Sequence, residues 1–145
     1  MLNSCTSVIV ALTIVLSFSA YDAVADEPKN VGYASLKDAI LQGKEPRMLI
    51  DFAACQVHGT RLAGPPIKAS VKPNQYMIQS DGTIAFATTH FTVRLDGSVR
   101  EFLSFRVHVD GKIDVHTMIL GAVNFEVSKD KSFDCEIGKA ATFHW

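Results

Sequence analysis

Two histidines flank a predicted turn in the segment HVDGKIDVH, residues 108–116. His108, Asp114 and His116 are side chains of types that bind zinc, and a zinc site needs three or four such ligands in one place. Arg106 follows the same alternation, and its positive charge would repel a cation. We therefore expect ordinary cross-strand pairs, His108 with Asp114 and Arg106 with His116, on the solvent-exposed face of a hairpin.

A second set of polar residues is a candidate ligand site. Its members are His90, Asp51, His58 and Arg61. A change in the phase of the apolar residues predicts a β-bulge between Ala87 and His90, and bulges often turn a side chain toward a site. Asp51 is either a buried carboxylate paired with an arginine or an outward residue of a half-buried strand. His58 and Arg61 belong to a long loop and could bind an anion; for these residues and His90 the alternative is an ordinary structural or solvated role.

The sequence contains none of the GxSxG, HExxH, P-loop or dinucleotide-binding motifs. We therefore assign no catalytic, metal-binding or cofactor-binding residues and expect no cofactor. The chain has 14 Lys and Arg against 15 Asp and Glu, a net charge of -1. Proteins that bind phosphate backbones usually carry a basic excess, so this balance argues against a nucleic acid partner.

The N-terminus has the pattern of a secretory signal peptide, residues 1–25. Residues 8–18 are a mostly apolar run, which is too short to span a bilayer because spanning takes about 20 residues. The small-x-small sequence AVA follows at 23–25 and predicts cleavage after Ala25. We expect a periplasmic or released protein that is not integral to the membrane once cleaved; an uncleaved anchor is the alternative.

Two cysteines, Cys55 and Cys135, remain after that cleavage, because Cys5 leaves with the signal peptide. An even number of cysteines in an exported chain predicts a disulfide. The bond would close a loop of about 80 residues and stabilise the fold by about 4 kcal/mol or less. Two buried free thiols are the alternative, and the absence of a CxxC pair argues against a catalytic thiol.

The rest of the chain predicts one short helix followed by strands. In SLKDAILQG, residues 35–43, three apolar side chains fall on one helical face, Ser35 is a suitable N-cap and Gly43 a suitable stop. RMLIDFA, residues 47–53, reads as a buried strand, and residues 56–74 form a loop of unusual length. Beyond residue 75 we expect strands, the last of them over 118–127 with a break near Gly121, over 132–137 and over 141–145.

Three Asp-Gly pairs, at residues 81–82, 96–97 and 110–111, predict tight hairpins. Three-residue loops beginning at each aspartate, with glycine in a left-handed conformation, place apolar residues opposite one another. The expected pairs are Val109–Ile113, Leu95–Val99, Val93–Glu101 and Ile78–Phe86. The predicted fold is α+β and mainly β: one domain over residues 26–145, with an N-terminal helix packed on an antiparallel meander or curled sheet.

The order of segments resembles the VirK family of small exported proteins from plant-interacting bacteria. The segments are SLKDAILQGKEPRMLIDFAAC, GPP, IAFATTHFTV, a strand–DG–strand run, and FDCEIG before a final aromatic strand. The resemblance covers essentially the whole chain after the signal peptide. It implies an accessory factor in virulence whose biochemical activity is not established, and it transfers no catalytic or ligand residues.

Together these features lead us to expect a non-enzymatic accessory protein of the periplasm, with an unknown protein or small-molecule partner in the envelope. The alternative is a small ligand-binding barrel or a hydrolase that acts on a cell-envelope or plant-derived molecule. In that case the long loop and His90 would form the site.

Overall fold

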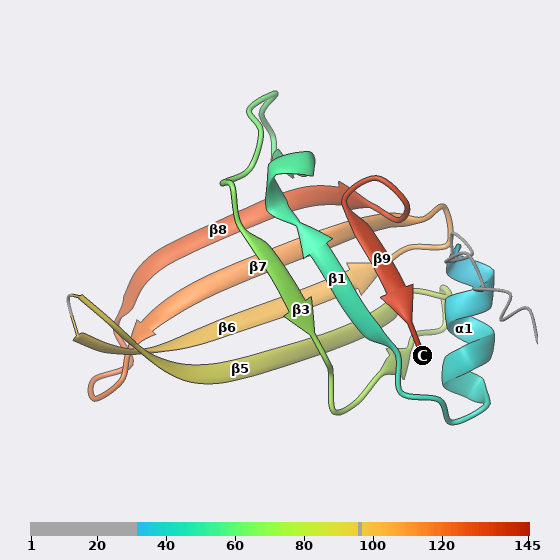
Figure 1. Cartoon of the computed structure of the whole chain (residues 1–145), viewed down its shortest axis with the longest axis horizontal. Coiled ribbons are helices and arrows are strands. Elements are labelled where there is room, and N and C mark those ends of the chain that lie inside the picture. The colour runs from blue at the N-terminus through green and yellow to red at the C-terminus, as the bar shows by residue number, and fades with distance from the viewer. Residues whose placement is uncertain (1–31, 96) are drawn as a thin grey trace, which may run out of the picture.

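The computed structural model describes residues 32–95 and 97–145 and is mainly antiparallel sheet with one helix, as predicted (Figure 1). The predicted signal peptide lies outside these residues. The elements are α1 (Tyr33–Leu41), β1 (Arg47–Asp51), the 3-10 helix η1 (Phe52–Ala54), β2 (Gln56–Val57), β3 (Lys68–Val71), β4 (Met77–Ile78), β5 (Ile84–Arg94), β6 (Gly97–Val107), β7 (Lys112–Gly121), β8 (Val127–Glu136) and β9 (Ala141–His144).

The helix α1 closes one end of the molecule (Figure 1). Leu36 and Ala39 are buried on the predicted apolar face. The predicted N-cap is wrong: the cap is Gly32, and Ser35 lies inside the first turn. Gly43 has φ +74°, the left-handed conformation that ends helices and that glycine adopts without strain.

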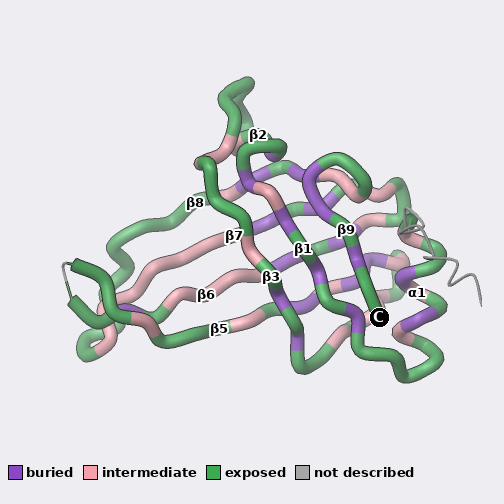
Figure 2. Tube along the Cα trace, viewed as in Figure 1, coloured by how far each residue is buried: buried purple, intermediate pink, exposed green. Residues whose placement is uncertain are grey.

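Two sheets form two layers around the core. The smaller sheet has the order β3-β1-β9, and the larger has the order β2-β8-β7-β6-β5-β4. The larger sheet ends at β2 and β4, so it is open and not closed into a barrel. Buried residues concentrate where the smaller sheet crosses the larger one (Figure 2). They include Met48, Ile50 and Phe143 from the smaller sheet and Phe86, Phe105, Val115 and Phe133 from the larger sheet.

Two of the hairpins have three-residue loops, but each loop lies one residue earlier than predicted. Val107 pairs with Ile113 and Ile78 with Ile84, so the expected pairs Val109–Ile113 and Ile78–Phe86 are wrong. Glycine occupies the last position of each loop, with φ +85° at Gly82 and +84° at Gly111. A type I turn followed by a left-handed residue demands glycine at that last position, which fixes the loop.

The hairpin between β5 and β6 differs more from the prediction. Arg94 pairs with Gly97, which leaves only residues 95 and 96 between the strands, and Asp96 lies outside the described residues. Val99 therefore pairs with Thr92 rather than with Leu95. The core sets this register, because it places Phe86 directly opposite Phe105, where the two rings stack with centroids 4.9 Å apart.

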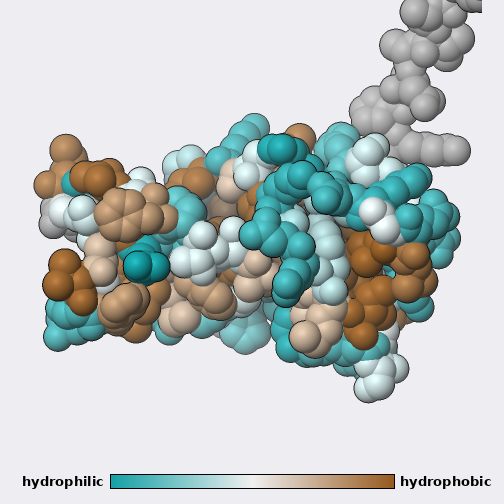
Figure 3. Space-filling view, turned by 90° about the horizontal axis from the view of Figure 1, so that it is seen from below, coloured by the Kyte–Doolittle hydropathy of each residue, from teal (hydrophilic) through white to brown (hydrophobic). Residues whose placement is uncertain are grey.

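The predicted bulge before His90 does not exist, because β5 pairs with β6 residue for residue over its whole length. The apolar residues change phase for another reason. Beyond the smaller sheet Phe91 and Val93 lie on the outer face of the larger sheet and remain 60% and 70% exposed. Apolar side chains gather at this end of the molecule, far from α1 (Figure 3).

The C-terminal strands match the prediction in part. The predicted break near Gly121 is confirmed, because β7 ends at Gly121 and residues 122–126 turn, but β8 begins at residue 127 rather than at 132. A register irregularity occurs here, between Ile119 and Leu120 opposite β8. The last predicted strand is present as β9. Within residues 32–95 and 97–145 no helix has the length and apolar character needed to cross a membrane.

Candidate functional site

The inner face of β5–β8 continues beyond the edge of the smaller sheet and forms a trough. We define the trough by the inner-face residues of these strands from Thr88 to Arg94 and their cross-strand neighbours. A cavity of about 200 Å³ lies where the trough meets the smaller sheet. The residues lining it are Phe52, Pro65, Ile67, Ala69, His90, Arg94, Glu101, Phe102, Leu103, Thr117, Met118, Ile119 and Phe133. The lining is thus mostly apolar, with one charged group of three residues.

That charged group is Glu101 held between His90 and Arg94. Register places His90 directly opposite Glu101, with Nε2 of His90 3.0 Å from Oε2 of the carboxylate. Arg94 donates from Nε to Oε1 at 3.0 Å and also from its terminal Nη2. The Glu101 side chain is only 19% exposed, against 54% for His90. Both carboxylate oxygens are therefore engaged inside a partly desolvated wall.

The roof of the cavity comes from η1 and the segment after Gly64. Asp51 begins η1 by accepting a hydrogen bond from the backbone N–H of Ala53 at 3.0 Å. This turn points Phe52 inward, where its ring packs edge-to-face on Phe133 at 5.2 Å. A Cβ on Gly64 would lie 2.2 Å from the backbone oxygen of Phe52, so only glycine allows this approach.

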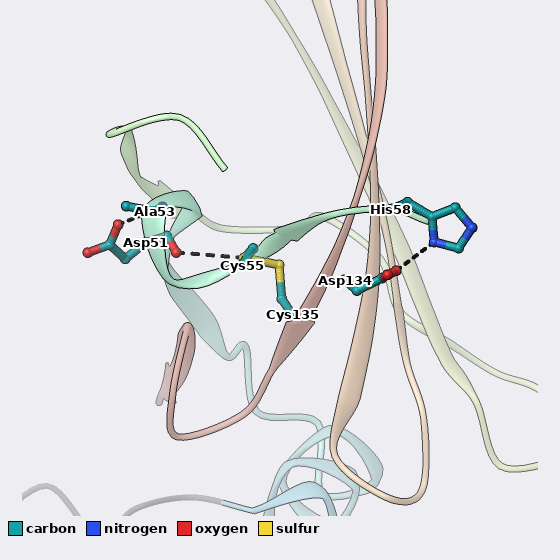
Figure 4. The surroundings of a disulfide bond; sticks show 6 residues. All are labelled: Asp51, Ala53, Cys55, His58, Asp134 and Cys135. Atoms are coloured by element: carbon teal, nitrogen blue, oxygen red, sulfur yellow. Dashed lines mark hydrogen bonds and ion pairs between the residues drawn. A yellow bond between two sulfur atoms is a disulfide. The ribbon is translucent and has the colours of Figure 1, made fainter. Parts of the chain in front are cut away.

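The cysteines tie this roof to the larger sheet. Cys55 and Cys135 form a disulfide across 80 positions of sequence, as predicted (Figure 4). Cys55 directly follows η1, and Cys135 lies on β8 two residues after Phe133. The bond therefore fixes the distance between the roof and the sheet beneath it.

Of the four candidate ligand residues, the structure places only His90 in the cavity wall. Asp51 is paired with Lys68, Oδ2 to Nζ 3.3 Å, rather than with an arginine. His58 donates from Nδ1 to Asp134 at 2.7 Å on the exposed side of β8 (Figure 4). Arg61 is exposed on the loop after β2. The candidate residues therefore do not form one site.

The two histidines of the HVDGKIDVH segment belong to separate ion pairs on the outer face. His108 contacts Asp114 at 2.8 Å, as expected, but diagonally, since Asp114 is directly opposite Arg106. The expected pair of Arg106 with His116 is wrong: His116 contacts Asp130 of β8 at 2.6 Å. In the described part of the chain, no three His, Cys, Asp or Glu side chains are grouped so that they could hold a metal ion.

Sequence reasoning missed Arg94 and Glu101. The predicted hairpin placed Glu101 opposite Val93 and so on the wrong face. The signal that could have found the pair is the uninterrupted register that matches Ile84 with Val107 and Phe86 with Phe105. Extending it along both strands brings His90 opposite Glu101.

Comparisons with known proteins found a family model, sequence relatives and a solved structure of the same fold. The family model described as VirK protein matches residues 30–125. The uncharacterized protein y4wH of Sinorhizobium fredii is 27% identical over 94% of this chain and 95% of its own. An uncharacterized protein of Rhizobium radiobacter, named for the pinF2 3' region, is 24% identical over 82% of this chain and 84% of its own. A crystal structure of a VirK family protein from Legionella pneumophila has the same fold, with TM-score 0.69, 21% identity and coverage of 79% of this chain and 97% of that one.

Proposed function

This chain belongs to the VirK family, and on that premise we propose that it is an exported accessory protein that binds a small molecule without transforming it. The site of binding is the trough with its cavity. The bound molecule comes from the cell envelope or from a host plant. The role in virulence is the one that the family resemblance implies.

One observation carries the proposal: an apolar cavity is open to solvent at the edge of the core. Small-molecule sites are typically concave and mostly apolar, with a few polar groups that fix orientation. The cavity has this character, with Leu103, Ile119 and Phe133 on its floor and the Glu101 group on its wall. Leaving such surface uncovered costs the fold about 25 cal/mol per Å² of apolar area, so its retention suggests use.

The contacts of Glu101 argue against this carboxylate as a catalytic acid or base. A general acid or base must have an atom free to exchange a proton with the substrate. Both oxygens of Glu101 are bonded, Oε1 to Arg94 and Oε2 to Nε2 of His90. Glu101 therefore acts as a fixed polar part of the cavity wall.

Export is supported by the N-terminal sequence and by the cysteines. The signal-peptide pattern ends at Ala25, before the first described residue. A disulfide between Cys55 and Cys135 suits an oxidising compartment such as the periplasm. An envelope protein or small molecule is the partner that this location offers.

Titration of the purified chain with dodecanol, a neutral apolar probe, tests the binding site. We expect saturable binding by calorimetry, and we expect Ile119→Trp to abolish it by filling the cavity. Leu62→Trp is the matched control, because Leu62 is exposed on the loop away from the cavity. No saturable binding to the wild type, or equal binding by the Ile119→Trp variant, would overturn the proposal.

A further inference from the structure

The trough carries more positively than negatively charged side chains. Strand pairing sets Lys131 opposite Thr117 and Lys129 opposite Ile119, and both of these β7 residues line the cavity. Directly paired residues point to the same face of a sheet. Lys129 and Lys131 therefore rise from the inner face on β8, across the trough from Arg94 on β5.

Among the paired inner-face positions that the structure describes, Glu101 is the single carboxylate, and its two oxygens contact Arg94 and His90. These described positions of the trough hold three cations, Arg94, Lys129 and Lys131, and one anion, Glu101. The outer face of β8 has the opposite character, because Asp130 and Asp134 alternate with the two lysines. These outer carboxylates are paired with His116 and His58.

We propose that the trough binds an amphipathic anion, whose apolar segment fills the cavity and whose carboxylate or phosphate head lies among the cations. This inference rests on the proposed binding function and names its ligand class. The cavity of about 200 Å³ is smaller than the roughly 300–1,000 Å³ of sites that enclose a whole drug-sized ligand. It therefore receives an alkyl segment or one ring, while the head group remains in the open, cationic part of the trough.

Lys129 and Lys131 could also serve to protect an edge strand, and the experiment must distinguish this role from ligand binding. The stretch of β8 beyond β2 is an unpaired edge, and lysines on edge strands prevent pairing with other chains. That role predicts altered aggregation on their removal and no change in ligand affinity. Ligand binding predicts a change in affinity that depends on the charge of the head group.

The experiment is a calorimetric titration of the purified chain with four probes that share one alkyl chain, the charged probes below their micelle concentrations and dodecanol below its solubility limit. They are dodecanoate, dodecyl phosphate, dodecanol and dodecyltrimethylammonium. We expect the two anions to bind at least about tenfold more tightly than dodecanol, the ratio that one charge-assisted hydrogen bond supports. The tighter of the two anions identifies the head group as carboxylate or phosphate.

Variants that remove either positive or negative charge from the trough test the role of charge in anion binding. Lys129→Gln/Lys131→Gln is expected to remove the advantage of the anions and leave dodecanol binding unchanged. Glu101→Gln is expected to strengthen anion binding, because it removes the one carboxylate and frees Arg94. Lys37→Gln/Lys112→Gln removes the same number of positive charges far from the trough. This control is expected to leave the affinities for the anions and for dodecanol unchanged.

The two proposals fail in distinguishable ways. Equal binding of dodecanoate, dodecyl phosphate and dodecanol would overturn the anionic ligand class and leave the binding function in place. The same conclusion follows if the Lys37/Lys112 control lowers anion affinity as much as the Lys129/Lys131 variant. Binding of none of the four probes would overturn both proposals.

Discussion

His90 on β5 and Glu101 on β6 are directly opposite each other, with Nε2 and Oε2 3.0 Å apart, on the part of the inner face that no second sheet covers. Arg94 completes the group from the same strand as His90. The sheet therefore holds a fixed, compensated carboxylate at the wall of an apolar cavity.

The ion pair at the wall is expected to stabilise the fold only modestly. Because the partners of Glu101 are partly exposed, we expect Glu101→Ala to lower the free energy of unfolding by about 1 kcal/mol, at the upper end for surface pairs. Urea denaturation measures the change. Glu136→Ala, which breaks the more exposed pair with Lys139, is the control and should cost less. An equal cost for both variants would contradict a partly desolvated wall.

The roof is expected to be sensitive to a single methyl group. Gly64→Ala places a Cβ 2.2 Å from the backbone oxygen of Phe52, and backbone atoms cannot yield as a flexible side chain can. We expect a loss of about 2 kcal/mol or more in stability, since relief requires the segment to move. We also expect loss of dodecanol binding because Phe52 and Pro65 line the cavity. Gly32→Ala meets nothing within 4 Å and is the control; equal stability of the two variants would refute the close approach.

The disulfide is expected to supply a large part of the stability. Replacing both residues, Cys55→Ser/Cys135→Ser, removes a cross-link that closes 80 positions of sequence. The loop-closure model predicts a loss of about 4 kcal/mol as an upper value. Urea denaturation of this variant, and of the wild type with and without reductant, measures it. A midpoint that does not respond to reductant would show that the thiols are not bonded.

The pair of His58 with Asp134 gives a pH dependence whose sign is fixed. The hydrogen bond from His58 to the Asp134 carboxylate, and then its charge, raise the pKa of His58 above 6.5. A histidine whose pKa is raised on folding adds stability that is complete below its unfolded pKa, about 6.5, and is lost as pH rises through the folded pKa. We expect an NMR titration of His58 to show a higher midpoint in the wild type than in Asp134→Asn. Identical midpoints would exclude the contact in solution.

The helix and the strands were predicted from the sequence better than the register in which the strands pair. The helix face of Leu36 and Ala39, the Asp-Gly hairpins and the cysteine pair all follow from local rules of periodicity, turn chemistry and cysteine count. Two loops were misplaced by one residue because glycine was expected at the middle position, whereas the left-handed residue of such a loop is the last one. The register of the β5–β6 hairpin depends instead on packing, which brings Phe86 onto Phe105.

The candidate site could be predicted only in part, for the same physical reason. His90 was singled out, but its partner depends on the register of the β5–β6 hairpin, which is set by core contacts far from it in sequence. Asp51, His58 and Arg61 were grouped by residue type. In the structure Asp51 ends β1 and pairs with Lys68, whereas His58 and Arg61 lie on the loop after β2. The cavity itself lies where the smaller sheet ends over the larger one. Local sequence patterns do not indicate where one sheet ends over another.

We propose that this chain is an exported protein that carries a bound small molecule. The intact mass of protein recovered from the periplasm, under native and denaturing conditions, tests both parts of this proposal. We expect a chain beginning at Asp26, lighter by two hydrogens than the reduced form, with extra native mass that is lost on denaturation. A full-length chain with free thiols, or a native mass equal to the denatured one at saturating ligand, would contradict it.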